Sequence, residues 1–257
     1  MSDITARGID VSYANGTVDW QRIRSNPEVD YALLRCGYGK LASQKDRAFE
    51  ANYRGAKEAG IPVGVYHYSY AMNREEAYEE AAACLEIIRG KQFEYPVYFD
   101  FEETGAKYNQ LALPAETKTA IITAFCEALE DAGCYAGVYS FASMLQDIYQ
   151  SIRQFDIWVA HTGVQQPAFS GEYGMWQYSH TGNVPGANTF SGKCDLNYAY
   201  KDYPALIKGA GLNGFLPETY VYDVTARNMS TLGEAETIAG MIRETGYTDT
   251  EITRRKI

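Results

Sequence analysis

Two carboxylates, Asp100 and Glu102, follow one another closely at the end of the apolar segment Tyr95–Phe101. Side chains of a β-strand alternate between its faces, so residues two apart share a face, with Cβ atoms roughly 7 Å apart. Such a pair suits glycoside hydrolysis, in which one carboxyl protonates the leaving oxygen and a second carboxylate handles charge or water at the anomeric carbon. With 33 acidic residues among 257, a D-x-E triplet also arises by chance on a solvated loop. The interpretation therefore depends on where the fold places this segment.

Two more acids lie near the ends of expected strands. Asp10 is close to the C-terminal end of the run Arg7–Ser12, and Asp195 lies in the run Thr189–Asn197. The C-terminal strand ends of a parallel barrel meet at one mouth, where such folds hold their ligands. Acids far apart in the chain would therefore line one cleft. Each acid alone also has a simpler interpretation, Asp10 as a cap of a backbone N–H group and Asp195 as a turn residue.

The rest of the chain supplies the elements that must position these acids. Apolar runs typical of strands alternate five times with segments whose apolar residues recur at helical spacing. The expected strands are residues 7–12, 29–36, 61–70, 95–103, 134–140 and 155–161. The expected helices are residues 18–23, 47–59, 74–88, 114–133 and 141–151. This alternation predicts right-handed βαβ units and an α/β fold with a parallel sheet or barrel.

The alternation stops after residue 161. Two strand-like stretches follow, Gly174–Ser179 and Thr189–Asn197, and only loops that contain glycine and proline separate them. A barrel that is finished by hairpins in place of βα units would account for this change.

The glycine-rich stretch Gly209–Gly214 is the best candidate for a domain boundary. Residues 1–210 would form the barrel, and residues 215–257 would form a small C-terminal α+β appendage. The pattern in the appendage predicts a strand, a helix and a strand at residues 220–225, 232–245 and 251–253. About forty residues bury little apolar surface by themselves. We therefore expect this segment to dock on the barrel or to pair with a second copy, which would make a dimer.

Charge and hydropathy exclude several classes of protein. The formal net charge is −10, whereas nucleic-acid binding requires a basic surface that displaces counterions. No apolar run approaches the ~18 residues that a membrane span needs, so no membrane insertion is expected. The first residues lack a basic start followed by an apolar core, so no signal peptide is expected either.

Five cysteines are spread along the chain, and none of them belongs to a C-x-x-C pair. An odd number without close pairs predicts free thiols, and neither a disulfide framework nor a zinc site. The candidate acids also lack histidine or cysteine partners at ligand spacing, which disfavours a transition-metal site. We therefore expect no metal and no cofactor.

Several short motifs occur in an order that resembles the glycoside hydrolase family 25 lysozymes, or N-acetylmuramidases. The matching motifs are Gly8–Ser12 with Val18–Trp20, Gly60–Tyr68, Tyr98–Glu102, Ala136–Tyr139, Trp158–Ala160, Trp176–Tyr178 and Asp195–Asn197. The resemblance implies an α/β fold, a modified TIM-like barrel in which five βα units are completed by three strands. It also implies hydrolysis of the β-1,4 bond between N-acetylmuramic acid and N-acetylglucosamine, with bacterial peptidoglycan as the partner.

The resemblance assigns roles to the acids. Glu102 matches the general acid of the family, whose carboxyl needs a raised pKa to hold its proton near neutrality, and neighbouring carboxylates such as Asp100 raise it. Asp100 matches the carboxylate that orients and stabilises the 2-acetamido group of the substrate, or that acts as the second catalytic carboxylate. Asp10 and Asp195 match the remaining acids of the cleft.

Six further residues match aromatic or polar positions of the substrate groove: Tyr66, Tyr68, Tyr139, Trp158, Trp176 and Gln177. Aromatic faces would pack on sugar rings, while Gln177 would hydrogen-bond a hydroxyl or an acetamide. Because side chains alternate along a strand, about half of the six are expected to face elsewhere. His67 is expected to be structural.

Two other functions compete with this one. A non-catalytic protein that binds cell-wall carbohydrate on the same barrel would be expected to lack Glu102 or Asp100, and both are present. A chitinase-type barrel carries a longer D-x-x-D-x-D-x-E run on its fourth strand, which residues 95–102 do not supply. The implied setting is either that of a phage endolysin, which a holin releases from the host cytoplasm, or that of an enzyme secreted to the cell wall.

Overall fold

The computed structural model describes residues 3–102, 109–216 and 231–244. The chain divides into two compact units, Met1–Glu218 and Thr219–Ile257. The glycine-rich stretch Gly209–Gly214 therefore belongs to the first unit, a few residues before the division.

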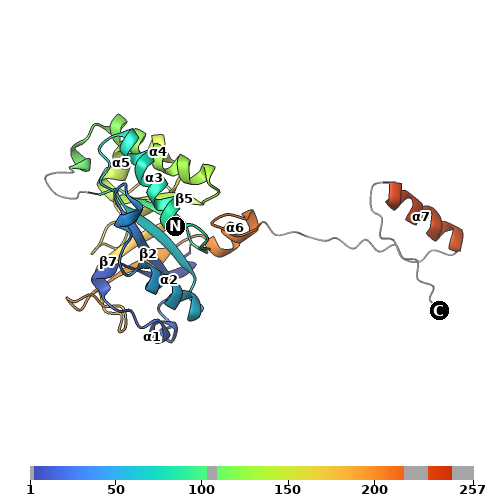
Figure 1. Ribbon diagram of the computed structural model, residues 1–257, viewed down its shortest axis with the longest axis horizontal. Helices are drawn as coiled ribbons and strands as arrows, with labels where there is room; N and C mark the ends of the chain where they lie inside the picture. Colours follow the sequence, from blue (N-terminus) through green and yellow to red (C-terminus); the bar gives the residue numbers. More distant parts are fainter. Residues whose placement is uncertain (1–2, 103–108, 217–230, 245–257) are drawn as a thin grey trace. The chain divides into compact units, whose positions relative to one another are not determined.

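The first unit is a closed barrel of eight strands that follow one another in chain order around the wall. Figure 1 shows helices packed around these strands. The strands are β1 (Ala6–Val11), β2 (Tyr31–Tyr38), β3 (Val63–Tyr68), β4 (Val97–Asp100), β5 (Ala136–Phe141), β6 (Asp156–Ala160), β7 (Met175–Gly182) and β8 (Cys194–Ala199). Strands β1 to β7 run parallel, and β8 is antiparallel to both β7 and β1.

A helix follows each of the first five strands. These helices are α1 (Trp20–Arg24), α2 (Phe49–Glu58), α3 (Arg74–Ile88), α4 (Ala115–Asp131) and α5 (Ala142–Ile152). The expected barrel of five βα units completed by three strands is thereby confirmed. The longer helices begin where the sequence provides a start signal: the Asn73 side chain accepts a hydrogen bond from the Glu76 N–H group, and Pro114 precedes α4.

The way the barrel closes differs from expectation in one respect. The sequence predicts hairpins after residue 161, but β6 and β7 pair in parallel, and of the consecutive strand pairs in the described barrel only β7 and β8 are antiparallel. The last strand also begins at Cys194 and not at Thr189, because residues 189–193 form a tight turn closed by a hydrogen bond from the Thr189 N–H group to the Lys193 carbonyl.

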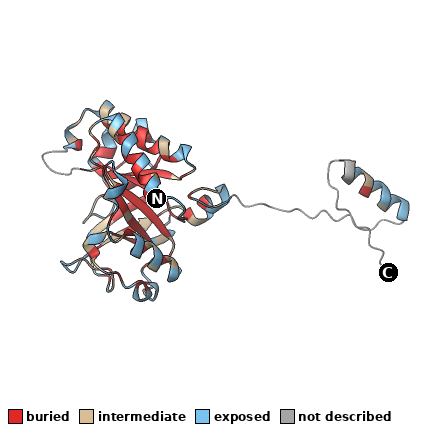
Figure 2. Ribbon diagram, in the orientation of Figure 1, coloured by how far each residue is buried: buried red, intermediate tan, exposed pale blue. Residues whose placement is uncertain are grey.

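Apolar side chains fill two layers. One layer lies between the outer faces of the strands and the helices, and the other fills the barrel interior with aromatic residues. Figure 2 shows the buried strands and the exposed outer faces of the helices around them. The layered core leaves one end of the barrel interior, the C-terminal strand ends, for polar groups.

Helix α6 (Tyr203–Ala210), which the sequence pattern did not reveal, covers the opposite end of the barrel. Tyr203 and Ile207 of this helix are fully buried in the interior cluster. Asn213, just beyond the helix, donates hydrogen bonds to the carbonyls of Phe93 and Tyr95, which precede β4. The glycine-rich stretch is therefore tied to the N-terminal ends of the strands.

Gly137→Ala is expected to lower the free energy of unfolding by about 1–3 kcal/mol, the usual cost of overpacking. A Cβ atom at this position of β5 would lie 2.5 Å from the Tyr98 ring and 2.8 Å from the Asp156 carbonyl oxygen. Urea unfolding measures the change. Gly209→Ala in α6 is the matched control, because its Cβ meets no atom within 4 Å and alanine favours a helix. Equal effects of the two substitutions would contradict the packing described for Gly137.

In the second unit the structure describes helix α7 (Leu232–Glu244), which confirms the helix expected at residues 232–245. Thr231 and Glu234 cap its start reciprocally, each accepting a hydrogen bond from the other's N–H group. The strands expected at residues 220–225 and 251–253 lie outside the described residues. Across the described ranges, no helix combines the length and hydrophobicity that crossing a membrane requires.

Candidate active site

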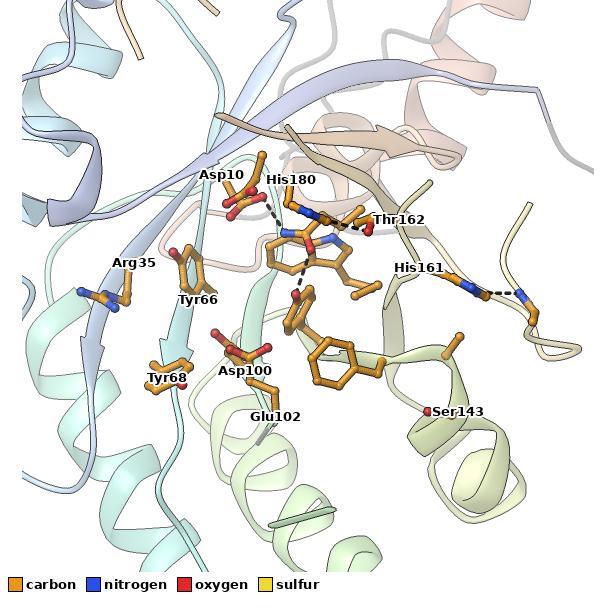
Figure 3. Close-up of a pocket in the computed structure, with 18 residues that line it drawn as sticks. Asp10, Arg35, Tyr66, Tyr68, Asp100, Glu102, Ser143, His161, Thr162 and His180 are labelled. Atoms are coloured by element: carbon orange, nitrogen blue, oxygen red, sulfur yellow. Dashed lines mark hydrogen bonds between the residues drawn. The ribbon is translucent and has the colours of Figure 1, made fainter. Parts of the chain in front are cut away.

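A pocket of about 750 Å³ opens at the C-terminal ends of the strands. All four predicted acids line it: Asp10 from β1, Asp100 from the end of β4, Glu102 two residues beyond that strand, and Asp195 from β8 (Figure 3). Barrel closure brings the first and last strands together, so that Asp10 and Asp195 face each other in register. The simpler interpretations of Asp10 as a backbone cap and Asp195 as a turn acid therefore do not apply.

Asp10 and Asp195 form one proton-sharing pair. Asp10 is 6% exposed, and burial, followed by the charge of Asp195, raises the pKa of its carboxyl to about 8. Its Oδ2 atom accepts hydrogen bonds from Asn197 Nδ2 at 2.8 Å and from Gln177 Nε2 at 3.1 Å. Burial also raises the pKa of Asp195, to about 6, although its hydrogen bond with Asp10 opposes the shift. Near neutral pH the pair therefore holds about one proton, carried by Asp10.

Asp100 and Glu102 form the second pair. Burial, followed by the charge of Glu102, raises the pKa of Asp100 well above its usual range. Burial and the charge of Asp10 raise the pKa of Glu102 to about 7, while a hydrogen bond with Tyr68 lowers it. Asp100 Oδ1 has no hydrogen-bond partner among the described residues. Glu102 can thus keep a proton near neutral pH, and Asp100 has an oxygen free for a substrate.

Arg35 is a pocket residue that we did not expect from the sequence. It is the only arginine or lysine among the described residues that line the pocket, and its charge lowers the pKa of Asp100. Its Nε atom donates to Oδ2 of the buried Asp46 at 2.7 Å, which fixes the guanidinium beside the acids. The sequence of β2 did indicate this orientation. Tyr31 and Leu33 face the barrel interior, and Arg35, two residues further along the strand, is expected to share their face.

Five of the six predicted groove residues line the pocket: Tyr66, Tyr68, Tyr139, Trp158 and Gln177. A chain of hydrogen bonds orients Gln177, whose Oε1 accepts from Tyr139 Oη at 2.9 Å while its Nε2 donates to Asp10. Trp158 Nε1 donates to Asn197 Oδ1 at 2.9 Å, and its ring lies 4.5 Å from that of Tyr139. The aromatic wall and the acids therefore form one connected network.

Trp176 has to be removed from the predicted groove residues. It precedes Gln177 on β7 and therefore points to the opposite, outer face of the barrel. There it is 6% exposed, packs against Tyr178 and Tyr198, and donates from Nε1 to the His161 carbonyl. Its role in the structure is packing.

The histidines divide between pocket and core. His161 and His180, on which we placed no functional expectation, line the pocket rim. His67 is fully buried outside the pocket, together with Cys36 and Cys84. In the described part of the chain, these three are the one cluster whose donor atoms lie close enough together to hold a metal ion.

Wild-type stability is expected to fall as the pH rises from about 4 to 8. The folded-state pKa values of Asp10 and Asp195, about 8 and about 6, lie above that of an ordinary aspartate. The folded state therefore binds more protons than the unfolded chain between these pH values. The two carboxyls consequently destabilise the folded state least near pH 4. Each proton that the folded state binds in excess of the unfolded chain changes the free energy of unfolding by roughly 1.4 kcal/mol per pH unit.

Asp10→Asn tests this linkage. The asparagine oxygen can accept from Asn197 and Gln177, while its amide group donates to Asp195, so the variant keeps the hydrogen bonds without the buried charge. We expect the variant to unfold at higher urea concentration than the wild type at pH 8, and the difference to close by about pH 4. A stability difference of the same size at both pH values would contradict the assigned pKa of Asp10.

A closed α/β barrel whose mouth holds paired carboxylates with raised pKa values beside aromatic side chains is an arrangement suited to glycoside hydrolysis. The chain belongs to the glycosyl hydrolases family 25, whose profile matches residues 9–187. This match confirms the resemblance in the sequence motifs.

Comparisons with individual proteins and solved structures support the same family. The autolytic lysozyme of Clostridium acetobutylicum is 27% identical over 194 residues, which make up 74% of this chain and 55% of that protein. The chain thus spans little more than half the length of this relative. Among solved structures, the bacterial lysozyme from Streptomyces coelicolor is 25% identical with a TM-score of 0.67, covering 80% of this chain and 96% of that one. The autolysin LytC from Streptococcus pneumoniae is 29% identical with a TM-score of 0.64, covering 76% and 46%.

Proposed function

We propose that this chain is a lysozyme that cleaves the β-1,4 bond between N-acetylmuramic acid and N-acetylglucosamine in bacterial peptidoglycan. The observation that carries the proposal is the pair at the end of β4: Glu102, whose pKa is raised to about 7, beside Asp100 with an unpartnered oxygen. The related autolysin LytC has been solved in complex with a synthetic peptidoglycan ligand, which supports the same substrate class here.

In the proposed reaction, protonated Glu102 donates its proton to the glycosidic oxygen as the bond to the anomeric carbon breaks. Asp100 orients the 2-acetamido group and, in its ionised form, stabilises the positive charge that develops at the sugar ring. The charge of Arg35 favours that form by lowering the pKa of Asp100, against the larger raising effect of burial and the neighbouring carboxylates. Water supplies the hydroxyl at the anomeric carbon and returns a proton to Glu102. The new reducing end is then N-acetylmuramic acid.

The remaining pocket residues hold the glycan. Tyr66 and Tyr139 present the small exposed parts of their rings to the pocket, where a sugar can contact them, and the fully buried Trp158 packs against both rings. Gln177 is oriented by Tyr139 and Asp10 and can hydrogen-bond a hydroxyl or an acetamide. The Asp10–Asp195 pair adds one buried negative charge at the far side of the cleft.

Mass analysis of fragments released from purified peptidoglycan tests the proposal. After borohydride reduction, the proposed bond cleavage gives fragments that end in reduced muramic acid. Fragments ending in reduced glucosamine would contradict the proposed bond specificity. Retained wall binding without any release would instead favour the non-catalytic carbohydrate-binding protein on the same barrel.

The rate of hydrolysis is expected to fall as the pH rises through about 7, by about tenfold per pH unit beyond it, because Glu102 then loses its proton. Tyr68→Phe removes the hydrogen bond that lowers the pKa of Glu102, so the falling limb should move to higher pH. Initial rates on peptidoglycan across pH 5–9 for both proteins measure the shift. A limb at the same pH in both would exclude Glu102 as its source.

We further propose that the activity resides in residues 1–210 and is exercised at the cell wall. Delivery would follow either the endolysin route, with holin-dependent release from a host cytoplasm, or secretion. The C-terminal segment would dock or dimerise, and size-exclusion chromatography with light scattering on the full chain would detect a dimer.

A further inference from the structure

We propose that Cys36, His67 and Cys84 form a structural binding site for a zinc ion between the barrel wall and α3. All three residues are fully buried, and their donor atoms lie within 4.8 Å of one another. They come from β2, β3 and α3, so the site joins three elements. The proposal is independent of the catalytic assignment, because none of the three lines the pocket.

The two distances from Cys36 to the other donor atoms are close to those of tetrahedral zinc. Cys36 Sγ lies 3.8 Å from Cys84 Sγ and 3.7 Å from His67 Nδ1. Zinc bonds of about 2.3 Å to sulfur and about 2.0–2.1 Å to nitrogen give tetrahedral edges of about 3.8 Å and 3.5 Å. The two thiolates would balance the two positive charges of the ion, so a neutral unit would be buried.

The imidazole of His67 is already oriented for coordination. Its Nε2 atom lies 2.8 Å from the carbonyl oxygen of Gly39, which can only accept, so Nε2 carries the proton. The lone pair of Nδ1 therefore points toward Cys36. A backbone carbonyl that fixes the tautomer in this way is the usual outer partner of a metal-bound histidine.

The backbone of β2 is specialised at the same place. Its pairing with β3 shifts register between Arg35 and Gly37, so Cys36 is an extra residue that no β3 residue opposes. The irregularity thus falls on the residue whose Sγ atom lies beside His67 and Cys84.

The position suggests what the ion would do. Cys36 follows Arg35, and His67 lies between Tyr66 and Tyr68, three residues that line the pocket. Strand alternation directs those neighbours inward while Cys36 and His67 point outward under α3. An ion at this point would stiffen the wall directly behind the groove.

Because the site is fully buried, the ion must enter during folding, so the full chain is expressed in media supplemented with zinc or with cobalt. We expect about one zinc ion per chain by elemental analysis. The cobalt form should show thiolate-to-cobalt charge transfer in the near ultraviolet and tetrahedral bands in the visible. Cys84→Ser should lose these bands and retain far less metal. Its loss of metal affinity should exceed the about 10–100-fold loss that follows removal of a residue that only hydrogen-bonds a metal ligand.

Cys126→Ser is the matched control, because Cys126 is equally buried but, within the described ranges, its thiol hydrogen-bonds only the Gly137 carbonyl. It should bind metal as the wild type does. If Cys84→Ser does not fold, the wild-type metal content and cobalt spectrum still decide. A wild type without metal, a cobalt spectrum without thiolate bands, bands that persist in Cys84→Ser, or a mass showing a Cys36–Cys84 disulfide would each overturn the proposal.

Discussion

Replacing Glu102 with glutamine is expected to lower the rate of peptidoglycan hydrolysis by about 10²–10⁴-fold, the usual contribution of a general acid. The amide has nearly the same shape but no acidic proton for the leaving oxygen. Because Glu102 is a partly buried carboxyl with a raised pKa, the neutral amide should also fold at least as stably at pH 8. The rate is measured as reducing ends released from purified peptidoglycan.

Glu172→Gln is the matched control, because Glu172 is exposed and does not line the pocket. It makes the same chemical change and should hydrolyse at the wild-type rate. Co-sedimentation with peptidoglycan should show that Glu102→Gln still binds the wall. Hydrolysis by Glu102→Gln within threefold of the wild-type rate would exclude Glu102 as the acid.

Replacing Asp156 with alanine is expected to lower the free energy of unfolding by about 3–5 kcal/mol, the usual cost of removing one partner of a buried ionic network. The Asp156 carboxylate is fully buried and accepts from Tyr98 at 2.9 Å, from Tyr203 at 2.7 Å and from Lys201 at 2.6 Å. Tyr98 and Tyr203 are fully buried and would lose this acceptor. Urea unfolding at pH 7 measures the loss.

Asp147→Ala on the exposed face of α5 provides the comparison, with an expected change within about 0.5 kcal/mol. Tyr203→Phe should have an intermediate effect, since it removes one donor but leaves the carboxylate its other partners. A loss below about 1 kcal/mol for Asp156→Ala would mean that the network contributes little to holding α6 on the barrel.

These two substitutions act at opposite ends of the same barrel. Glu102 lies at the C-terminal ends of the strands, in the pocket, and Asp156 begins β6 beside the residues that α6 covers. We therefore expect Glu102→Gln to remove activity and keep stability. At a temperature where it remains folded, Asp156→Ala should remove stability and keep activity.

The sequence by itself determined the order of strands and helices through residue 161 and the helix Leu232–Glu244. Those elements follow from local signals: apolar periods of two or of about 3.6 residues, and glycine or proline at their ends. The same signals placed Asp10, Asp100, Glu102 and Asp195 near strand ends, because the position of an acid relative to an apolar run is itself local. The type of fold and the four acids were therefore predictable.

Only the tertiary structure decided the features that depend on distant contacts. The outward orientation of Trp176 follows from the register of β7, and the parallel pairing of β6 with β7 from barrel closure. The ion pair with Asp46 fixes the Arg35 side chain beside the acids of the pocket. Helix α6 is defined by the packing of Tyr203 and Ile207 on the barrel interior. The raised pKa values, and the meeting of Cys36, His67 and Cys84, arise because folding buries groups far apart in the chain next to one another, and no local pattern encodes that proximity.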